Sequence, residues 1–365
     1  MKILLAGLGG GCGIGRYEVL LLSALENSVA GDGVELSSLW RNRHASYLNV
    51  PARHAKRDGR ATRRPHFALK VIWHAVAMPA DIVIFTLPNL APLALPLSLL
   101  RPSTRVVVCT HGIEIWSRLS WARGVALRRA HRVVASATYN AERIAAVQRV
   151  RPERIEVIPL ALSPSWGAGG RDADVSARRQ DGTKLLSVAR MEASEGYKGV
   201  DAVICALPHV RRRVPEVSYT VVGVGTDLER LRRLAKDCGV ADAVRFVGTV
   251  DDVRLLREYQ ECDVFVLPST GEGFGLVFLE AMSFGKPIVA AAAGGAIDIV
   301  QDGETGRLVE SPDEVADAVL ELLLNRDAAK EMGARGRARL EAVFSFDRYV
   351  ERWREALHVV LAERT

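Results

Sequence analysis

The sequence predicts an α/β protein of two doubly wound domains, each with a parallel sheet between layers of helices. The chain has 365 residues, enough for two domains that each bury a core. Short β-branched runs alternate with longer helical patterns along most of its length. The alternation stops once, in a polar, Gly-rich segment at 163–182, and then begins again. Two βαβ series joined by a linker are typical of two doubly wound domains.

The first series occupies residues 1–162 and predicts an N-terminal Rossmann-like domain. Apolar, β-branched runs with turn signals at their ends predict buried parallel strands. These runs lie at 2–6, 81–87, 105–111 and 131–137. Segments 16–28 and 141–150 between them have helical periodicity.

The second series occupies residues 183–343, after the linker. Its predicted strands lie at 183–189, 218–223, 244–248, 263–268 and 287–291. The last segment, 344–365, predicts an amphipathic helix. Because ligands of such sheets bind at the carboxyl ends of the strands, we predict the site in the cleft between the two domains.

The composition excludes several classes of protein. Hydrophobic residues make up 48% of the chain, which is typical of a globular protein and not of a disordered one. The five cysteines are scattered and none forms C-x-x-C, which argues against disulfides and structural zinc and favours a reducing compartment. The N-terminus lacks the apolar core of a signal peptide, and no apolar run reaches the roughly 18 residues of a spanning helix. We therefore expect a cytoplasmic protein.

Charge is unevenly distributed along the chain. Residues 1–160 contain 22 Lys and Arg against 10 Asp and Glu, a net +12, whereas the remainder contains 27 against 33, a net −6. The basic excess is greatest at 52–74, where Phe67, Ile72 and Trp73 lie beside the charges. Such a run suits an anionic lipid surface or a phosphorylated substrate, and it equally suits a solvated, arginine-rich face. No nucleic-acid-binding motif accompanies it, so nucleic acid is not predicted as a partner.

The loop after the first strand, "GLGGGCGIGRY" (7–17), is a candidate phosphate-binding loop. Glycines let the backbone approach a phosphate, and the helix that follows offers N–H groups. No three of these glycines have the G-x-G-x-x-G spacing, which argues against a nicotinamide or flavin enzyme. A tight strand-to-helix turn would explain the same glycines.

Two cations follow the first strand of the second series. Arg190 and Lys198 lie between that strand and the next helix. At the carboxyl end of a strand, this pair suits the paired negative charge of a diphosphate. The alternative is two surface cations on a loop.

The segment "GEGFGLVFLEAMSFGKP" (271–287) carries Glu272 in a glycine loop and Glu280, eight positions later, in the helix that follows. The amides at 274–276 open this helix, where an anion is favoured. The two carboxyls of a glycosidase stand about 5–9.5 Å apart, whereas eight helical steps span about 12 Å. We therefore interpret the glutamates as two contacts to one extended ligand, a nucleotide sugar whose diphosphate lies on the amides.

This segment resembles the E-x7-E motif of retaining glycosyltransferases of the GT-B fold, family four (glycosyl transferases group 1). The resemblance covers nearly the whole chain and includes "GCGIGRY" (11–17), "RIEVIPLAL" (154–162), "LLSVAR…EGYKGVD" (185–201), "RFVGTV" (245–250) and "GGAIDIVQDGETGRLV" (294–309). It implies two doubly wound Rossmann-like domains facing across a cleft. The first would be on the acceptor side, the second would bind the nucleotide sugar, and helix 344–365 would cross back to the first.

The resemblance also implies a role for each candidate residue. Arg190 and Lys198 would bind the donor diphosphate, Glu272 the sugar hydroxyls and Glu280 the ribose. His111 ends a first-domain strand and would lie near the transferred sugar, with a buried structural histidine as the alternative. The catalytic candidates are therefore His111, Glu272, Arg190 and Lys198, and the donor-binding candidates are Gly13, Arg190, Lys198, Val247, Glu272, Gly273, Phe274, Gly275, Leu276 and Glu280.

The implied reaction moves a hexose from a UDP- or GDP-linked donor to an acceptor hydroxyl, with retention of configuration. We expect a lipid-linked glycan precursor of cell-surface polysaccharide as acceptor, an anionic membrane surface as a candidate partner, and a peripheral enzyme on the inner face of the membrane. No cofactor and no metal is predicted, since the D-x-D match at Asp172 and Asp174 lies in the linker. A nucleotide-sugar-binding subunit without turnover, or a soluble acceptor, are the alternatives. The chain departs from the family pattern at Asp298, where Glu is usual, and after Pro159, where P-N-G is common.

Overall fold

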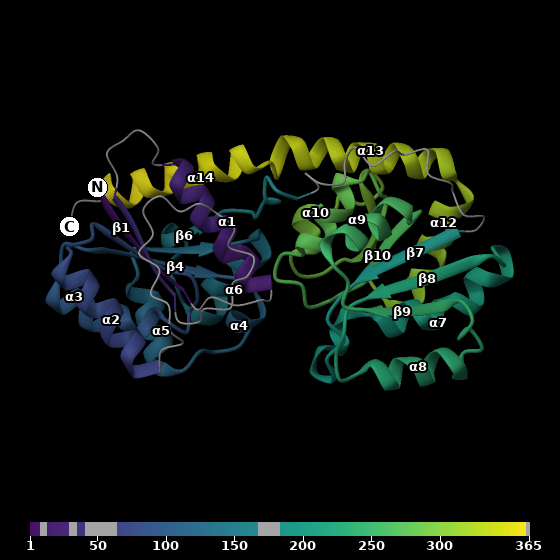
Figure 1. The fold of residues 1–365 in the computed structure, drawn as a ribbon, viewed down its shortest axis with the longest axis horizontal. Coiled ribbons are helices and arrows are strands. Elements are labelled where there is room, and N and C mark those ends of the chain that lie inside the picture. The colour runs from purple at the N-terminus through teal and green to yellow at the C-terminus, as the bar shows by residue number, and fades with distance from the viewer. Residues whose placement is uncertain (8–12, 29–34, 41–63, 167–182, 363–365) are drawn as a thin grey trace. The chain divides into compact units, whose positions relative to one another are not determined.

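The structure, a computed structural model, divides the chain into two compact units (Figure 1). Unit 1 consists of residues 1–161 together with 346–365, and unit 2 consists of residues 162–345. Each unit contains one six-stranded parallel sheet. The structure describes residues 1–7, 13–28, 35–40, 64–166 and 183–362.

Unit 1 has the strand order β2-β1-β3-β4-β5-β6. The strands are β1 (Lys2–Gly7), β2 (Glu35–Trp40), β3 (Ile82–Phe85), β4 (Arg105–Thr110), β5 (Arg132–Ala135) and β6 (Ile155–Val157). Its helices are α1 (Gly13–Ser28), α2 (Arg64–Ala77), η1 (Ala91–Leu93), α3 (Ala94–Leu100), α4 (Ile113–Trp116), α5 (Trp121–Arg129), α6 (Thr138–Gln148), η2 (Pro152–Arg154) and α14 (Phe346–Ala362). The sequence predicted the four central strands to within two residues at each end, and it did not predict β2 or β6.

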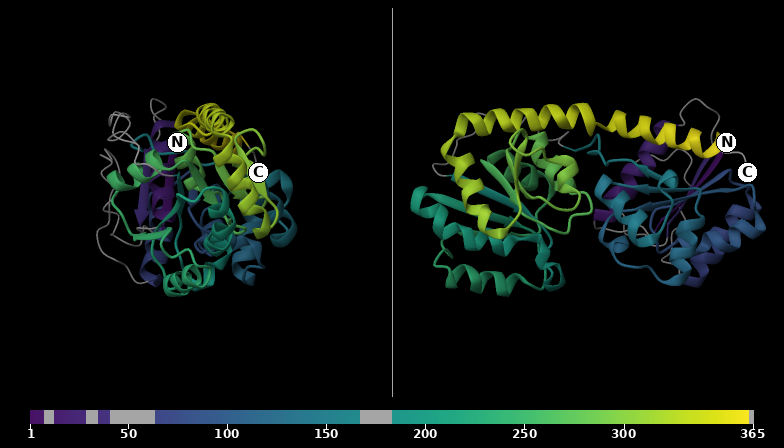
Figure 2. Two further views of the ribbon diagram at one scale, coloured as in Figure 1. Left: turned by 90° about the vertical axis from the view of Figure 1, so that its right-hand side faces the viewer. Right: turned by 180° about the vertical axis from the view of Figure 1, so that it is seen from behind.

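Alternate residues of β4 show how helices cover both faces of this sheet. Val106 and Val108 belong to a core that includes α2, α3 and α5. Cys109 points to the opposite face, beside Tyr17 of α1. On that face α1 packs along α14, as two views of the ribbon also show (Figures 1 and 2).

Helix α2 carries the end of the basic segment. Phe67 is only 3% exposed and belongs to the core of unit 1, so its predicted place beside lipid is wrong. Trp73 is 68% exposed, and Leu69, one helical turn earlier, is 65% exposed. Ile72 is half-buried. The basic side chains at Arg53, Lys56, Arg57, Arg60 and Arg63 lie outside the described residues.

Unit 2 has the strand order β12-β11-β10-β7-β8-β9. The strands are β7 (Thr183–Val188), β8 (Val217–Val222), β9 (Val244–Gly248), β10 (Val264–Leu267), β11 (Ile288–Ala291) and β12 (Gly306–Val309). The helices are η3 (Ala193–Lys198), α7 (Val200–Arg213), α8 (Leu228–Asp237), α9 (Asp252–Glu261), α10 (Leu276–Ser283), α11 (Ala296–Ile299), η4 (Pro312–Glu314), α12 (Val315–Leu324) and α13 (Arg326–Val343). The sequence predicted five of these strands and missed β12.

The central strand β10 again separates two layers. Val264 and Val266 belong to a core with α7, α8 and α12. Phe265 points the other way, with its ring centroid 5.7 Å from Tyr259 of α9 and 6.0 Å from Phe278 of α10. Helices α9 and α10 therefore cover the face of the sheet opposite α7.

Candidate functional site

Two loops of unit 2 meet at the carboxyl ends of neighbouring strands. Strands β7 and β10 are adjacent and parallel. The loop after β7 carries Arg190 and Lys198, and the loop after β10 carries Glu272. The backbone N–H of Thr270 donates to the carbonyl of Tyr197 at 2.9 Å and joins the two loops. The topology thus brings together both predicted cations and the first predicted glutamate.

Lys198 and Glu272 form an ion pair. The Lys198 Nζ and Glu272 Oε1 are 2.5 Å apart, and the two side chains are 19% and 13% exposed. Because most of both side chains is withdrawn from water, solvent and salt screen this pair less than a surface pair. A phosphate oxygen and a sugar hydroxyl bound here would find an ammonium donor and a carboxylate acceptor side by side.

Arg190 forms an ion pair with Glu195, which the sequence did not single out. The Arg190 Nε donates to Glu195 Oε2 at 2.9 Å, and Nη2 donates to Oε1. The Arg190 side chain is 61% exposed, whereas that of Glu195 is 12% exposed. The two-point contact fixes the direction of the exposed guanidinium. The only sequence signal for Glu195 was a carboxylate between two cations.

The ring of Tyr197 lies against the loop that carries Glu272. A Cβ added at Gly271 would lie 2.3 Å from the Tyr197 Cδ2, so a larger residue would displace the ring. The Lys198 Nζ is 5.4 Å from the centroid of the same ring, within cation–π range. Burial, together with the nearby carboxylates of Glu195 and Glu272, raises the pKa of Tyr197 to about 12. The phenol is therefore a neutral support between the two loops near pH 7.

Two glycines support the loop around Glu272 from behind. The Gly295 N–H donates to the Glu272 carbonyl at 2.8 Å. Gly294 has φ +62°, and a Cβ there would lie 2.5 Å from the same carbonyl oxygen. A Cβ at Gly295 would lie 2.5 Å from the Phe274 Cα. This close approach of two backbones explains why the sequence has two consecutive glycines at this point.

The predicted anion-binding amides lie at the start of α10. Gly275 precedes the helix with φ +101°, in the left-handed region that favours glycine. Leu276 is the first helical residue, and among the described side chains none caps this end. Gly273 connects Glu272 to Phe274, whose buried side chain packs 6.0 Å from the ring of Phe344. The first N–H groups of α10 thus follow Glu272 within the same loop-to-helix segment.

Glu280 is the fifth residue of α10 and is 3% exposed. Its Oε2 accepts a hydrogen bond from the Tyr259 Oη at 2.7 Å. The carboxylate that the resemblance assigns to the ribose is therefore held from inside the unit.

His111 lies in unit 1, directly after β4. Its Nε2 is 2.7 Å from the Thr86 carbonyl oxygen, and its backbone N–H donates to the Glu114 Oε1 at 2.5 Å. The Tyr17 ring meets the imidazole edge to face, with centroids 4.2 Å apart. Because a carbonyl only accepts hydrogen bonds, the proton must be on Nε2. The imidazole is thus held in one orientation, with a proton on Nε2.

Glu18 and Cys109, which lie behind His111, were not predicted as part of the site. Thr86 Oγ1 donates to the Glu18 Oε1 at 2.7 Å, and Glu18 is only 2% exposed. Burial raises the pKa of the Cys109 thiol to about 12, so Cys109 is a neutral neighbour of Tyr17. A buried carboxylate and an aromatic ring therefore fix the strand ends that carry His111.

The remaining predicted residues are distributed between the units. Gly13 is the first residue of α1, and the rest of its glycine loop, residues 8–12, lies outside the described residues. Val247 is half-buried in β9. Asp172 and Asp174 also lie outside the described residues. Within the described part of the chain, no three side chains of His, Cys, Asp or Glu come together in a group that could hold a metal ion.

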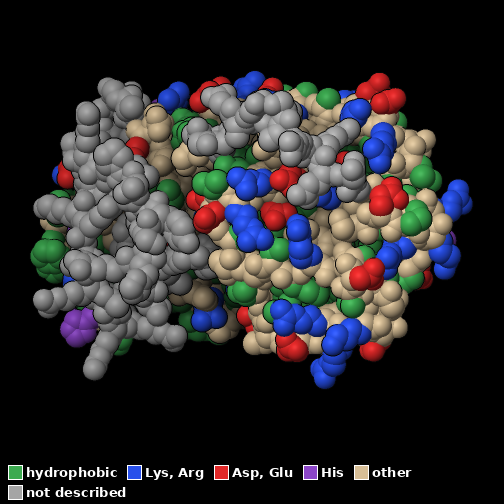
Figure 3. All heavy atoms as spheres, turned by 45° about the vertical axis from the view of Figure 1, so that its right-hand side comes forward, with side chains coloured by type: hydrophobic (Ala, Val, Ile, Leu, Met, Phe, Trp, Pro, Cys, Tyr) green, Lys and Arg blue, Asp and Glu red, His purple; other side chains and the backbone are tan. Residues whose placement is uncertain are grey.

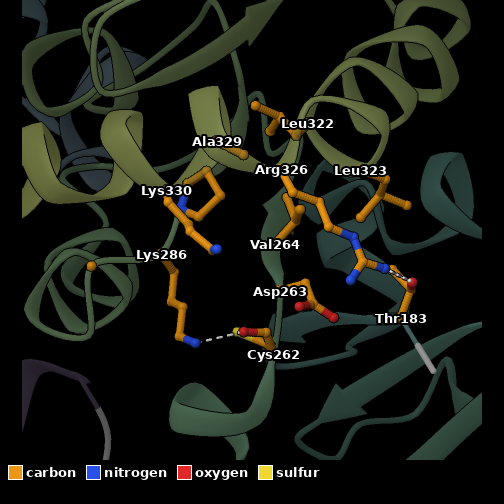
Figure 4. Close-up of a pocket in the computed structure, with 12 residues that line it drawn as sticks. Thr183, Cys262, Asp263, Val264, Lys286, Leu322, Leu323, Arg326, Ala329 and Lys330 are labelled. Atoms are coloured by element: carbon orange, nitrogen blue, oxygen red, sulfur yellow. Dashed lines mark hydrogen bonds between the residues drawn. The ribbon is translucent and has the colours of Figure 1, made fainter. Parts of the chain in front are cut away.

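A separate cavity of about 100 Å³ lies at the opposite ends of the unit 2 strands, around Thr183, Asp263 and Lys286 (Figure 4). Its polar groups are engaged in holding the fold. The Lys286 Nζ donates to the carbonyls of Gln260 and Cys262 at 2.8 and 2.6 Å, and the Asp263 Oδ2 accepts from the Lys184 N–H at 2.9 Å. In α/β sheets ligands bind at the carboxyl ends of the strands, so the candidate site is the Lys198–Glu272 region and not this cavity.

Known families and proteins resemble this chain in sequence over most of its length. Residues 171–339 match the family described as glycosyl transferases group 1, and residues 13–166 match glycosyltransferase family 4. The chain is 38% identical over 277 residues to a GDP-mannose-dependent alpha-(1-6)-phosphatidylinositol monomannoside mannosyltransferase of Mycobacterium tuberculosis, covering 70% of this chain and 71% of that protein. It is 35% identical over 198 residues to a D-inositol 3-phosphate glycosyltransferase of Acidothermus cellulolyticus, covering 50% of this chain and 43% of that protein.

A solved structure of Anabaena Alr3699/HepE in complex with UDP is similar in fold. Its TM-score is 0.78 at 20% sequence identity, over 98% of this chain and 100% of that one. A glycosyltransferase from Rickettsia africae has a TM-score of 0.79 at 15% identity, over 100% and 99%. Together with the two parallel sheets, these likenesses confirm the predicted fold class.

Proposed function

We propose that this chain, which belongs to the group 1 glycosyl transferases and has their GT-B fold, transfers a hexose from a nucleotide diphosphate-sugar to an acceptor hydroxyl with retention of configuration. The observation that carries the proposal is the Lys198–Glu272 ion pair at the carboxyl ends of β7 and β10. It provides one group for the leaving diphosphate and one for the sugar hydroxyls, in a loop that leads into the N-terminus of α10.

Departure of the nucleoside diphosphate develops negative charge on the β-phosphate. In the proposed mechanism Lys198, Arg190 and the first amides of α10 stabilise that charge, while Glu272 accepts hydrogen bonds from the sugar. These cations would take the place of a divalent metal, so we propose transfer that needs no metal ion and no cofactor. Loss of transfer on EDTA treatment, with recovery on adding Mg²⁺ or Mn²⁺, would refute this part of the proposal.

We propose GDP-mannose as the first donor to test, because the 38% identical relative is named as GDP-mannose-dependent. The assay follows transfer of labelled mannose from GDP-mannose, with UDP-glucose as the matched alternative donor. Thermal melting in the presence of each nucleotide measures binding independently of turnover, since a ligand at 100 times its Kd adds about 2.7 kcal/mol of stability. Stabilisation without transfer to any lipid or soluble acceptor would favour a binding subunit over an enzyme.

We propose a lipid-linked acceptor met at a membrane surface, with unit 1 on the acceptor side. The relative named above acts on phosphatidylinositol monomannoside. Residues 1–160 carry the net charge of +12, whereas basic and acidic side chains are interspersed on the face of unit 2 in Figure 3. No helix among the described residues is long and apolar enough to cross a bilayer.

Exposed apolar side chains on α2 and α3 are the proposed contact with lipid. Leu69 and Trp73 of α2 are 65% and 68% exposed, and Leu99 and Leu100 of α3 are 83% and 57% exposed. The two helices pack together (Figures 1 and 2). Apolar side chains of this kind next to basic charge suit the interface of an anionic bilayer.

The test of the membrane contact is co-sedimentation with vesicles of anionic or neutral lipid, at low and high salt. We expect binding to anionic vesicles that salt weakens, and loss of binding in Leu69→Ser/Trp73→Ser. Leu324→Ser, which removes an exposed leucine from unit 2, is the control. Equal sedimentation of all three proteins with anionic vesicles would refute the contact through Leu69 and Trp73, and no sedimentation with anionic lipid at low salt would make a soluble acceptor the better hypothesis.

A further inference from the structure

A buried phenol and a buried carboxylate meet behind the candidate site. Tyr259 is 0% exposed and Glu280 is 3% exposed. The Tyr259 Oη donates to the Glu280 Oε2 at 2.7 Å. A carboxylate withdrawn from water to this degree requires hydrogen-bond donors, and a buried tyrosine hydroxyl requires a partner. The Tyr259 hydroxyl therefore supplies a hydrogen-bond donor to Glu280, and the Glu280 carboxylate supplies the acceptor for that hydroxyl.

The Tyr259 ring is held by aromatic neighbours on several sides. Phe284 stacks on it, with centroids 5.9 Å apart and planes 6° from parallel. Trp166 meets its edge at 6.1 Å, and Phe265 lies 5.7 Å away. Trp166 is itself fixed, because its Nε1 donates to the Ser283 Oγ at 3.1 Å. The hydroxyl thus comes from a ring that has little freedom to turn.

We propose that Tyr259 is a positioning residue for recognition of the donor's ribose. It acts through Glu280, whose carboxylate it fixes in the orientation that accepts the ribose hydroxyls. Tyr259 has no exposed surface, so it does not contact the donor itself. A carboxylate that accepts two hydroxyls must have its plane fixed, and groups behind the binding residue supply that orientation. This inference rests on the proposed function, since it assumes that the ligand is a nucleotide.

Tyr259→Phe removes one hydroxyl and leaves the ring. Calorimetric titration compares the binding of GDP and of 2′,3′-dideoxy-GDP, which lacks both ribose hydroxyls, to wild type and variant. We expect the variant to bind GDP about tenfold more weakly, in line with loss of a hydrogen bond to a charged group. We expect both proteins to bind the dideoxy compound equally, because it has no ribose hydroxyls that could donate hydrogen bonds to Glu280. A purely structural defect would weaken both ligands alike.

Tyr219→Phe is the matched control. Tyr219 is also 0% exposed in unit 2, and its hydroxyl is 2.7 Å from the Ser187 Oγ within the sheet. The Tyr219→Phe variant loses a buried tyrosine hydrogen bond that does not involve Glu280. Its preference for GDP over the dideoxy compound should therefore equal that of wild type. If the Tm of Tyr259→Phe is well below that of Tyr219→Phe, a second variant tests the inference. Phe284→Leu keeps the Tyr259 hydroxyl but removes the ring stacked on it, and it should weaken the binding of GDP but not of dideoxy-GDP, to a smaller extent than Tyr259→Phe.

The outcomes separate this inference from the proposed function. Wild-type protein that binds no nucleoside diphosphate, neither GDP nor UDP, would overturn both. Wild-type protein that binds GDP and dideoxy-GDP equally would overturn the inference alone. Equal loss of both ligands in Tyr259→Phe, or no loss of either, would also overturn it while leaving the proposed transfer intact.

Discussion

Replacing Lys198 with methionine removes the charge from one partner of the Lys198–Glu272 pair and keeps most of the aliphatic stem. A surface ion pair contributes about 0–1 kcal/mol, whereas breaking a buried one by removing one partner costs about 3–5 kcal/mol. The side-chain exposures of 19% and 13% place this pair closer to the buried limit, so we expect a loss of about 2–3 kcal/mol. For a unit the size of residues 162–345, that loss lowers the Tm by roughly 5–10 °C.

The double variant Lys198→Met/Glu272→Gln separates stability from function. With both charges removed, no unpaired carboxylate remains buried, and we expect the Tm to return to within about 2 °C of wild type. Hexose transfer should stay about 10²- to 10³-fold below wild type, because a preorganised cation at the leaving group is missing. The measurements are thermal melts without ligand and kcat/KM for the donor. The reasoning would be refuted if the single variant melted at the wild-type temperature, or if the double variant regained transfer together with its Tm.

Three further predictions concern other parts of the chain. His111→Asn, whose amide lies near the Nδ1 position, should retain more transfer than His111→Gln, whose amide replaces Nε2 on the Thr86 carbonyl. Both variants should lose roughly 10²-fold in kcat/KM. The opposite order of the two kcat/KM values would contradict the assignment of a proton to Nε2. Gly294→Ala should lower transfer at least about tenfold by pushing on the Glu272 carbonyl 2.5 Å from its Cβ, whereas Gly239→Ala, with a similar φ of +68° and nothing within 4 Å, should lower only the Tm. Burial raises the pKa of Glu156, so the contribution of this carboxyl to stability is present at acid pH and is lost as the pH rises through that pKa. Glu156→Gln should therefore raise the Tm at pH 7, and the gain in Tm should vanish below about pH 4. A constant gain in Tm at every pH would contradict burial as the cause.

The strands that the sequence failed to predict share one position in the fold. β2, β6 and β12 are all edge strands, and each pairs with one neighbour only. β6 has three residues, and β2 contains two consecutive serines. A central parallel strand is buried on both faces and is a continuous apolar run, whereas an edge strand is shorter and partly exposed. The periodicity of apolar residues therefore predicted the central strands of both sheets and failed to predict three edge strands.

The candidate site was predictable to the extent that it follows strand ends. Arg190, Lys198 and Glu272 stand in the loops that follow two predicted strands, so topology alone placed them together. Glu195 and Tyr259 were not predicted, because their roles arise from contacts that side-chain packing creates. The same limit explains the error at Phe67, where a mixed basic and aromatic run gave no sign of which aromatic residue faces the core.

Helix α14 completes unit 1 from a distant part of the sequence. Its Tyr349 and Trp353 are each 1% exposed in the layer that it shares with α1. During synthesis this helix emerges from the ribosome only after the whole contiguous stretch 162–345 of unit 2. Domains usually fold in the order of translation, but here the N-terminal sheet waits for its last covering helix. The α1 face of the first sheet therefore lacks its covering helix until all of unit 2 has been synthesised, and it is the surface that a chaperone would meet.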